Sequence, residues 1–238
     1  MRLPKALAFD VFGTVVDWRS GIARDVAPLL DLLGRTDVTP EAFADGWRAR
    51  YQPAMARVRS AERPFVILDA LHRETLEELL VSLEIDPAAV GEERLRDLTL
   101  AWHRLDPWPD AVTGLTRLKR RFPIVTLSNG NIALMLDMAR RAGLPWDAIL
   151  GAEVSGHYKP DAEAYLATAR ALAIQPDELC LVAAHHSDLG AARAAGLMTA
   201  YVDRPMEYGG RPAPDRSFAQ EWEWSVGSLT ELAELLGA

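Results

Sequence analysis

The chain has 238 residues, which is long enough for one large α/β domain or for a core domain that carries a smaller inserted one. With 49% hydrophobic and 25% charged residues it lies in the ordinary globular range, which excludes a disordered chain. The net charge of -8 argues against a nucleic-acid partner, because phosphate binding needs a concentrated basic surface.

The first predicted element is a buried strand at Lys5–Asp10, with the sequence KALAFD. This apolar run ends in the carboxylate of Asp10, and Gly13 follows where a tight turn is needed. We therefore expect a strand that ends in a loop and presents Asp10 at its carboxyl end.

A long helical insertion is predicted after this strand, because about a hundred residues separate it from the next apolar run, too many for one ordinary crossover. The pattern is helical from about Trp18 to about Arg104, and Asp106-Pro107-Trp108-Pro109 ends it. The apolar spacings that carry this prediction are Phe43, Trp47 and Tyr51 in steps of four, and Leu76, Leu79, Leu80 and Leu83 on one helix face. We expect a helical cap domain at residues 17–104, and a core at 1–16 and 105–238.

Four further apolar runs alternate with helix-like segments in the second half of the chain. They are Pro123–Leu127, Ala148–Val154, Leu179–Ala183 and Thr199–Val202. This alternation predicts an α/β fold with a parallel sheet and helices on both of its faces.

The cysteine content and the termini indicate a cytoplasmic protein. The single cysteine, Cys180, lies in the apolar run LCLV and is expected to be buried, and it excludes an intramolecular disulfide. We find no signal peptide and no run near the ~20 apolar residues of a membrane span, so no membrane partner is expected.

Chemically useful side chains follow the predicted strands. Ligands of open parallel sheets bind beyond the carboxyl ends of the strands. The residues found there are Asp10, Ser128, Asn129, Lys159 and Asp188. Each has a structural alternative, as a helix N-cap, a turn residue or a surface lysine. Their joint occurrence at strand ends predicts a site with a nucleophilic carboxylate, a cation and a second carboxylate.

Four segments resemble the motifs of the haloacid dehalogenase superfamily, in the same order. They are FDVFGTVVD at 9–17, LSNG at 127–130, YKPD at 158–161 and the loop at 183–188. The resemblance covers nearly the whole chain and implies a Rossmann-like core with an inserted helical cap.

Two positions separate a dehalogenase from the magnesium-dependent phosphatases of that superfamily. Phosphatases carry an acidic residue two positions after the nucleophile, where this chain has Phe12. An alkoxide leaves poorly without a general acid, whereas a halide leaves without one. Ala184 stands where phosphatases place a magnesium ligand, so we expect no metal and no cofactor. A zinc site is also not expected, because the adjacent His185 and His186 would point to opposite sides.

The closer resemblance is to the L-2-haloacid dehalogenases, which hydrolyse small (S)-2-haloalkanoic acids to 2-hydroxy acids. It implies that Asp10 displaces the halide and forms an ester, which water then cleaves at its carbonyl carbon. Lys159 would keep Asp10 ionised and oriented, and Asp188 would place or activate the water. Thr14 and Ser128 match positions that hydrogen-bond the nucleophile and the substrate carboxylate.

The same resemblance implies residues that bind the substrate and the halide. Trp47-Arg48 resembles a segment whose arginine binds the departing halide, with Asn129 as a second polar group, although a guanidinium would equally suit the carboxylate. Tyr165 matches the family, or is simply a half-buried helix aromatic. The expected binding set is Arg48, Asn129, Val11, Phe12, Tyr165 and His185, with Val11 and Phe12 acting through their backbone N–H groups.

The chain departs from related dehalogenases in the last motif. Ser187 replaces an aromatic residue, and Ala183 and His185 stand where some relatives have serine and asparagine. The preferred halide, the natural substrate and the enantiomer therefore stay open at this stage. By analogy alone, we expect a homodimer.

Two other functions remain as alternatives. One is a phosphatase for a small phosphate ester that uses another acid, such as His185, in place of Phe12. The other is a non-catalytic binding protein, which the intact set of Asp10, Thr14, Ser128, Lys159 and Asp188 disfavours.

Overall fold

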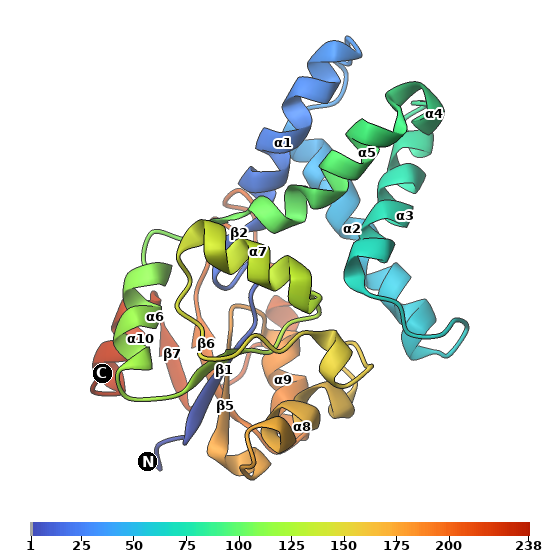
Figure 1. The fold of residues 1–238 in the computed structure, drawn as a ribbon. Helices are drawn as coiled ribbons and strands as arrows, with labels where there is room; N and C mark the ends of the chain where they lie inside the picture. The colour runs from blue at the N-terminus through green and yellow to red at the C-terminus, as the bar shows by residue number, and fades with distance from the viewer. Residues whose placement is uncertain (1) are drawn as a thin grey trace.

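A five-stranded parallel sheet forms the centre of the computed structural model, which describes residues 2–238. The strand order is β4-β1-β5-β6-β7 (Figure 1). The strands are β1 (Ala6–Phe9), β4 (Ile124–Thr126), β5 (Leu179–Ala183), β6 (Met198–Val202) and β7 (Trp224–Val226). The chain leaves β1 toward β4 and leaves β5 toward β6, so the strand order reverses direction between β1 and β5.

Helices cover both faces of this sheet, because side chains alternate between two apolar clusters along each strand. Leu7 and Phe9 of β1 belong to one cluster, and Ala6 and Ala8 belong to the other. The first face packs against α6 (Ala111–Lys119), α7 (Ile132–Ala142) and α10 (Leu229–Leu235), and the second against α8 (Ala162–Ala171) and α9 (His186–Ala194). The predicted α/β class is confirmed.

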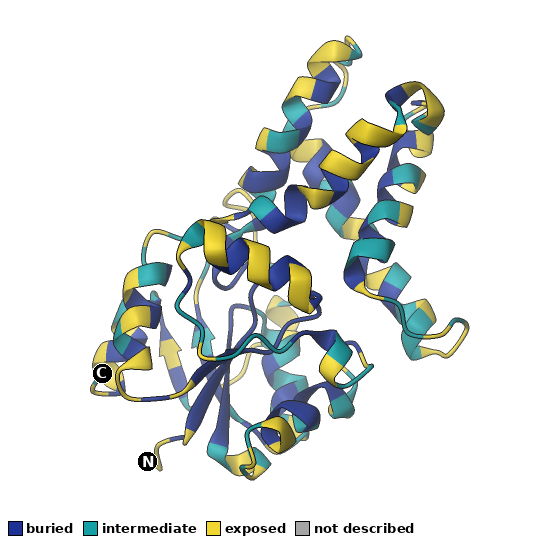
Figure 2. Ribbon diagram, in the orientation of Figure 1, coloured by how far each residue is buried: buried dark blue, intermediate teal, exposed yellow. Residues whose placement is uncertain are grey.

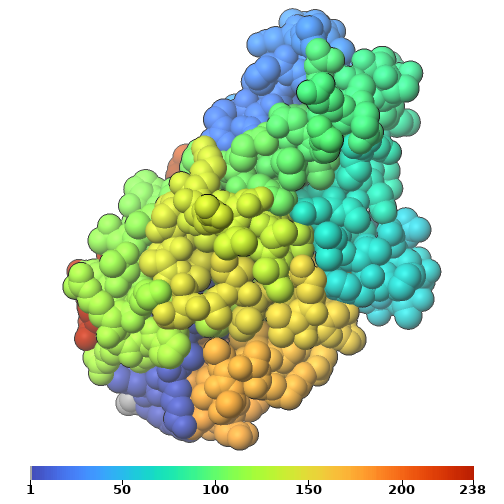
Figure 3. Space-filling view, in the orientation of Figure 1, coloured from blue at the N-terminus to red at the C-terminus, as the bar shows by residue number. Residues whose placement is uncertain are grey.

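A bundle of helices is inserted between two short antiparallel strands, β2 (Val16–Asp17) and β3 (Asp106–Pro107). Its elements are α1 (Trp18–Leu32), α2 (Pro40–Arg59), α3 (Leu68–Ser82), α4 (Pro87–Val90), α5 (Glu92–Thr99) and the 3-10 helix η1 (Leu100–Arg104). The bundle extends from one end of the core and gives the molecule an elongated shape (Figure 3). Side-chain caps begin three of the helices, since Asp17 accepts a bond from the backbone of Ser20, Thr39 accepts one from Ala42, and Asp86 accepts one from Ala88.

The apolar stripe of α2 lies inside this bundle. Phe43, Trp47 and Tyr51 are all buried, as the sequence predicts, and the inner surfaces of the helices are buried throughout (Figure 2). The same hydrophobic cluster continues without a break into the sheet through Phe12 and Trp18. The inserted helices and the core therefore share one apolar interior.

Within the five-stranded sheet, one predicted strand is wrong and one real strand was not predicted; the short pair β2 and β3 was not predicted either. The run Ala148–Val154 makes a single bridge, from Ala148 to Val125, and then forms the 3-10 turn η2 (Ala152–Val154). The Thr126 side chain replaces the expected ladder, since its hydroxyl both accepts from the Leu150 N–H and donates to the Leu150 carbonyl. The missed strand is β7, which has three residues.

Several smaller features complete the fold. Two further 3-10 turns are η3 (Pro176–Glu178) and η4 (Arg216–Phe218). Cys180 lies fully buried in β5, as expected. Between residues 2 and 238, no helix has both the length and the apolar character that crossing a bilayer requires.

Candidate active site

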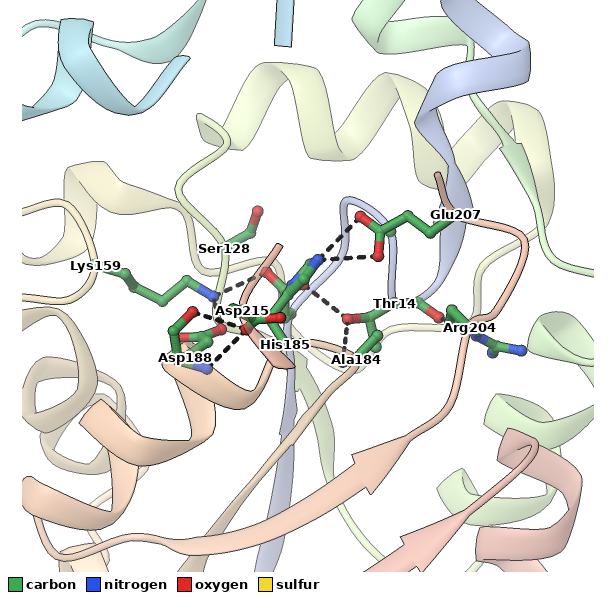
Figure 4. A network of polar contacts seen from close by, with 12 residues as sticks. Thr14, Ser128, Lys159, Ala184, His185, Asp188, Arg204, Glu207 and Asp215 are labelled. Carbon is green, nitrogen blue, oxygen red and sulfur yellow. Dashed lines mark hydrogen bonds and ion pairs between the residues drawn. The ribbon is translucent and has the colours of Figure 1, made fainter. Parts of the chain in front are cut away.

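Asp10 lies at the carboxyl end of β1, beside the point where the strand order reverses. Its backbone N–H donates to the Val182 carbonyl of β5, which continues the strand pairing up to this residue. The carboxylate is 7% exposed and receives two bonds, from Lys159 Nζ to Oδ1 at 2.9 Å and from Thr14 Oγ1 to Oδ2 at 2.8 Å. The nucleophile predicted from the sequence is thus held at both oxygens, by Lys159 and Thr14, which are labelled in Figure 4.

The ammonium group of Lys159 lies between two carboxylates. It is 2.9 Å from Asp10 Oδ1 and 2.5 Å from Asp188 Oδ2. Asn129 holds the backbone of this lysine, since its Oδ1 accepts from the Lys159 N–H at 2.8 Å. Tyr165 donates its hydroxyl to Asp188 Oδ1 at 2.7 Å. Four of the predicted residues therefore form one network around Asp10.

This network favours the charged forms of Asp10 and Lys159. Burial alone would raise the pKa of Asp10, but the charge of Lys159 and a bond from His185 outweigh burial and hold that pKa well below its ordinary value. Burial would likewise lower the pKa of Lys159, but Asp10 and Asp188 raise it. The network thus favours the ionised form of the Asp10 carboxylate, which is the form that acts as a nucleophile.

Thr14 and Ser128 have supporting positions. Thr14 also accepts a bond from the Ala184 N–H at 2.8 Å, so its hydroxyl joins the loops that follow β1 and β5. Ser128 accepts from the Gly130 N–H at 3.1 Å, and among residues 2–238 it makes no hydrogen bond with Asp10. The expected contact of Thr14 with the nucleophile is therefore present, and the role expected of Ser128 toward the substrate carboxylate stays a prediction.

A cleft of about 930 Å³ opens above Asp10 between the core and the inserted helices. The predicted site residues that line it are Asp10, Phe12, Arg48, Asn129, Lys159, Tyr165, His185 and Asp188. Trp18, Tyr51 and Tyr208 also line it and were not predicted. The sequence-based site is therefore assembled in one place, mostly by residues of the core.

Arg48 brings a cation to this cleft from α2. Its guanidinium carbon lies 4.1 Å from the centre of the Tyr51 ring and 5.5 Å from that of Trp18. Its Nη1 is buried, and no hydrogen-bond partner for it is found in the described part of the chain. A buried donor of this kind calls for an anion.

The loop after Asp10 contains Val11 and Phe12, whose backbone N–H groups are expected to bind the substrate. The Val11 side chain is fully buried in the apolar cluster and does not line the cleft. Its carbonyl accepts from the N–H groups of Val15 and Val16, which closes the loop. The N–H groups of Val11 and Phe12 have no acceptor within residues 2–238, and the Phe12 ring packs edge-on against Trp102. Val11 can therefore contact a ligand only through its backbone.

Glu207 is a site residue that the sequence did not reveal. It is 2% exposed, and it contacts His185 Nε2 through both carboxylate oxygens, at 3.0 and 3.1 Å. The other ring nitrogen, His185 Nδ1, lies 3.2 Å from Asp10 Oδ2. Glu207 lies in the loop that follows β6. Ligands of parallel sheets bind beyond the carboxyl ends of the strands, so this position was the signal for Glu207 in the sequence.

His186 points away from this site, as expected for adjacent residues. Its ring stacks on Tyr201 at 4.3 Å and accepts a bond from the Trp222 indole N–H. Ser187 donates through its N–H and its hydroxyl to Asp215 Oδ2, so it binds a neighbouring loop.

The donor set does not fit a magnesium ion of the kind that phosphatases of this fold use. Phe12 and Ala184 occupy positions that would supply oxygen ligands. The space between Asp10 and Asp188 holds the ammonium group of Lys159, which repels a divalent cation. We therefore derive no step through a metal.

Comparison with known proteins agrees with this geometry. The family model for haloacid dehalogenase-like hydrolases matches residues 4–196. The crystal structure of a defluorinating L-2-haloacid dehalogenase has a TM-score of 0.95 and 48% identity, covering 100% of this chain and 96% of that one. (S)-2-haloacid dehalogenase 1 of Pseudomonas sp. strain CBS-3 is 31% identical over 98% of this chain and 96% of its own. A phosphoglycolate phosphatase of Chromobacterium violaceum is 28% identical over 98% of this chain and 96% of its own.

Proposed function

Because this chain belongs to the haloacid dehalogenase-like hydrolase family, we propose that it hydrolyses the carbon–halogen bond of small (S)-2-haloalkanoic acids to give 2-hydroxy acids. The observation that carries the proposal is the ionised, lysine-bound carboxylate of Asp10 with Phe12, and no acid, two positions later. The enzyme is thus a hydrolase of carbon–halide bonds, like its relatives that are named haloacid dehalogenases.

The first step would be attack of the Asp10 carboxylate on C2 of the substrate, which releases halide, inverts C2 and leaves an ester on Asp10. Lys159 holds the carboxylate in place for the attack. The N–H groups of Val11 and Phe12, with Ser128, would bind the substrate carboxylate. Supporting this, both N–H groups lack a protein acceptor within residues 2–238.

Arg48 and Asn129 would receive the departing halide. Arg48 offers a buried guanidinium donor whose partner is not found in residues 2–238, and Asn129 offers its amide nitrogen, since its oxygen is bound to Lys159. Both residues line the cleft that contains Asp10.

The second step would be attack of water on the carbonyl carbon of the ester, which frees the 2-hydroxy acid and restores Asp10. The oxygen that leaves in the product is then one that belonged to Asp10. Asp188 would help to place the water, with Tyr165 and Lys159 fixing both of its oxygens.

The phosphatase alternative is less supported, although one relative bears that name. A phosphate ester needs an acid for its leaving alkoxide and a cation for its charge. Phe12 supplies no proton, and the site offers no magnesium ligands at Phe12 or Ala184.

Residues 17–104 would act as a cap that closes over the site. The support is that Arg48 and Trp18 line the cleft from this segment. We also propose that the protein is cytoplasmic and forms a homodimer. Light scattering of the purified protein tests the dimer, and a mass of one chain would overturn it.

Halide release tests the activity directly. The protein is incubated in chelator with fluoro-, chloro- and bromoacetate and with both enantiomers of 2-chloropropionate, and free halide is measured. We expect release from the (S) enantiomer and loss of activity in Asp10→Asn. No halide from any substrate, together with phosphate-ester hydrolysis after magnesium is added, would refute the proposal.

Heavy-oxygen water tests the covalent route. In a single turnover the label should enter Asp10, because the first product carries an enzyme oxygen. Label that appears at once in the 2-hydroxy acid would show direct attack of water on C2.

A further inference from the structure

His185 lies between two buried carboxylates. Its Nδ1 is 3.2 Å from Asp10 Oδ2, and its Nε2 is 3.0 Å from Glu207 Oε1. The His185 side chain is 14% exposed, and that of Glu207 is 3% exposed. One ring nitrogen thus faces the nucleophile, and the other is bound to the carboxylate of Glu207 (Figure 4). A histidine that a carboxylate orients in this way can act as an acid or a base.

Contacts with neighbouring residues hold Glu207 in this position. The Trp18 indole donates to Glu207 Oε1 at 2.9 Å. Gly13 makes room for the carboxylate, because a Cβ at this glycine would lie 2.2 Å from Oε1. Arg204, in the same loop, donates to the Thr14 carbonyl and pairs with Asp110. Glu207 is therefore held in a buried position next to His185, unlike the partner of an exposed ion pair.

We propose that His185, oriented by Glu207, is the base that takes the proton from the water that cleaves the Asp10 ester. The inference rests on the dehalogenase function proposed above. Water attacks the ester carbonyl carbon and gives one proton to His185 Nδ1. The carbon–oxygen bond to the substrate then breaks, and that proton passes to the departing alkoxide, which leaves as the 2-hydroxy acid. Asp10 remains as a carboxylic acid, which returns its proton to His185.

Formation of the ester makes His185 available as a base. Burial would lower the pKa of His185, but the charge of Glu207 and the bonds to Asp10 and Glu207 raise it well above its ordinary value. Esterification removes the charge of Asp10, one of the causes that raise the pKa of His185, and this favours release of one proton from the imidazolium to solvent, the single proton of the overall reaction. Neutral His185 keeps Nε2–H on Glu207 and exposes the lone pair of Nδ1. The charged and titratable groups around it are Asp10, Arg48, Lys159, Asp188, Glu207 and Tyr208.

Asp188 is worse placed for this proton. Its Oδ2 is bound to the Lys159 ammonium at 2.5 Å, and its Oδ1 accepts from Tyr165 at 2.7 Å. A carboxylate stabilised by a cation and a hydroxyl is a weak base. His185 has one nitrogen next to the carboxyl group under attack, so it serves as the base and Asp188 holds Lys159.

His185→Gln tests the inference by separating the two steps. The variant is mixed with (S)-2-chloropropionate, halide is followed in rapid quench, and the protein mass is measured. We expect one halide per active site in a burst, an ester on the Asp10 peptide, and a steady rate at least about 100-fold lower. His186→Gln is the matched control, since that ring faces Trp222 and lies outside the cleft, and it should turn over like the parent.

Glu207→Gln tests the positioning role and covers the case in which His185→Gln does not fold. Removal of the anion lowers the pKa of His185, so we expect the rise of ester hydrolysis with pH to shift to lower pH, with some ester accumulating. Turnover of His185→Gln within about threefold of the parent would overturn the inference. So would an unshifted pH profile in Glu207→Gln with no accumulated ester. A parent that releases no halide would instead refute the dehalogenase function itself.

Discussion

The guanidinium of Arg48 stacks on the ring of Tyr51 in the next turn of α2, with 4.1 Å between the guanidinium carbon and the ring centre. This stacking fixes the plane of the cation while its Nη1 stays free of hydrogen bonds among residues 2–238. A lysine keeps the charge but has neither the planar donors nor the stacking surface.

Arg48→Lys should therefore reduce kcat/KM for 2-chloropropionate by about 100-fold, which corresponds to ~2.8 kcal/mol. The measurement is halide release over a range of substrate concentrations. Arg50→Lys is the control, because Arg50 donates to the Gly46 carbonyl and to Ser82 outside the cleft. Equal losses in both variants would show that α2, and not the Arg48 cation, is responsible.

Lys159→Met should abolish activity and destabilise the fold by about 3–5 kcal/mol at pH 7, because it leaves two buried carboxylates without their cation. The pKa of Asp10 is lower in the folded state than in the unfolded state, where it is about 4. The ion pair therefore stabilises the fold above about pH 4, and this stabilisation is lost as the pH falls toward the folded pKa. The deficit of the variant should thus shrink below pH 4. Urea denaturation at pH 3 and pH 7 measures it.

A lysine at an exposed ion pair provides the comparison for that experiment. Lys5 pairs with Glu178 while its side chain is 61% exposed, so Lys5→Met should cost at most about 1 kcal/mol. A similar cost for both lysines would mean that Asp10 does not depend on Lys159.

Phe12→Leu should widen the substrate range. The Phe12 ring lines the cleft and packs against Trp102, so its loss opens space beside Asp10. A methylene in an apolar pocket is worth about 1–3 kcal/mol, so the ratio of kcat/KM for 2-chlorobutyrate over chloroacetate should rise about tenfold. Phe122→Leu removes a ring from another buried site and should leave the ratio unchanged. A ratio that does not move in Phe12→Leu would place the size limit elsewhere.

His103 joins the inserted helices to the core in a pH-dependent way. Its Nε2 lies 3.1 Å from Asp69 of α3, and its Nδ1 lies 2.9 Å from Asp137 of α7. Burial would lower the pKa of His103, but both carboxylates raise it above its ordinary value. The folded state thus holds this proton more tightly than the unfolded state, and the stabilisation is complete below about pH 6.5 and disappears as pH rises through the folded pKa.

His103→Gln should therefore lower Tm more at pH 6 than at pH 9, as measured by thermal unfolding at both values. His157→Gln removes an exposed histidine that pairs with Asp161 and should shift Tm little at either pH. A deficit in His103→Gln that is the same at both pH values would assign the effect to packing.

The centre of the site was predictable because it depends on topology. Asp10 and Asp188 follow β1 and β5, and the carboxyl ends of parallel strands meet at one edge. Lys159 follows the run at 148–154, which is not a strand but lies beside β4 through the bridge from Ala148 to Val125. The direction of a side chain is not set in this way. Ser128 bonds to its own turn, and the Val11 side chain packs into the core.

The contacts that the sequence does not reveal are long-range ones. Glu207 reaches His185 only through a loop held by Arg204, and its indole donor, Trp18, comes from the start of the first inserted helix. The run at 148–154 is as apolar as a strand, yet the Thr126 hydroxyl takes the bonds that a ladder would have used.

The unbroken apolar interior of the molecule makes its two parts thermodynamically interdependent. Phe12 and Trp18, at the junction, pack in the same cluster as Trp47 of α2 and Leu7 of β1. Neither part buries its own surface completely without the other, so we expect core and inserted helices to unfold together as one cooperative unit. A stabilising substitution deep in the helical segment therefore also protects the strand that carries the nucleophile, although the two lie far apart in the chain.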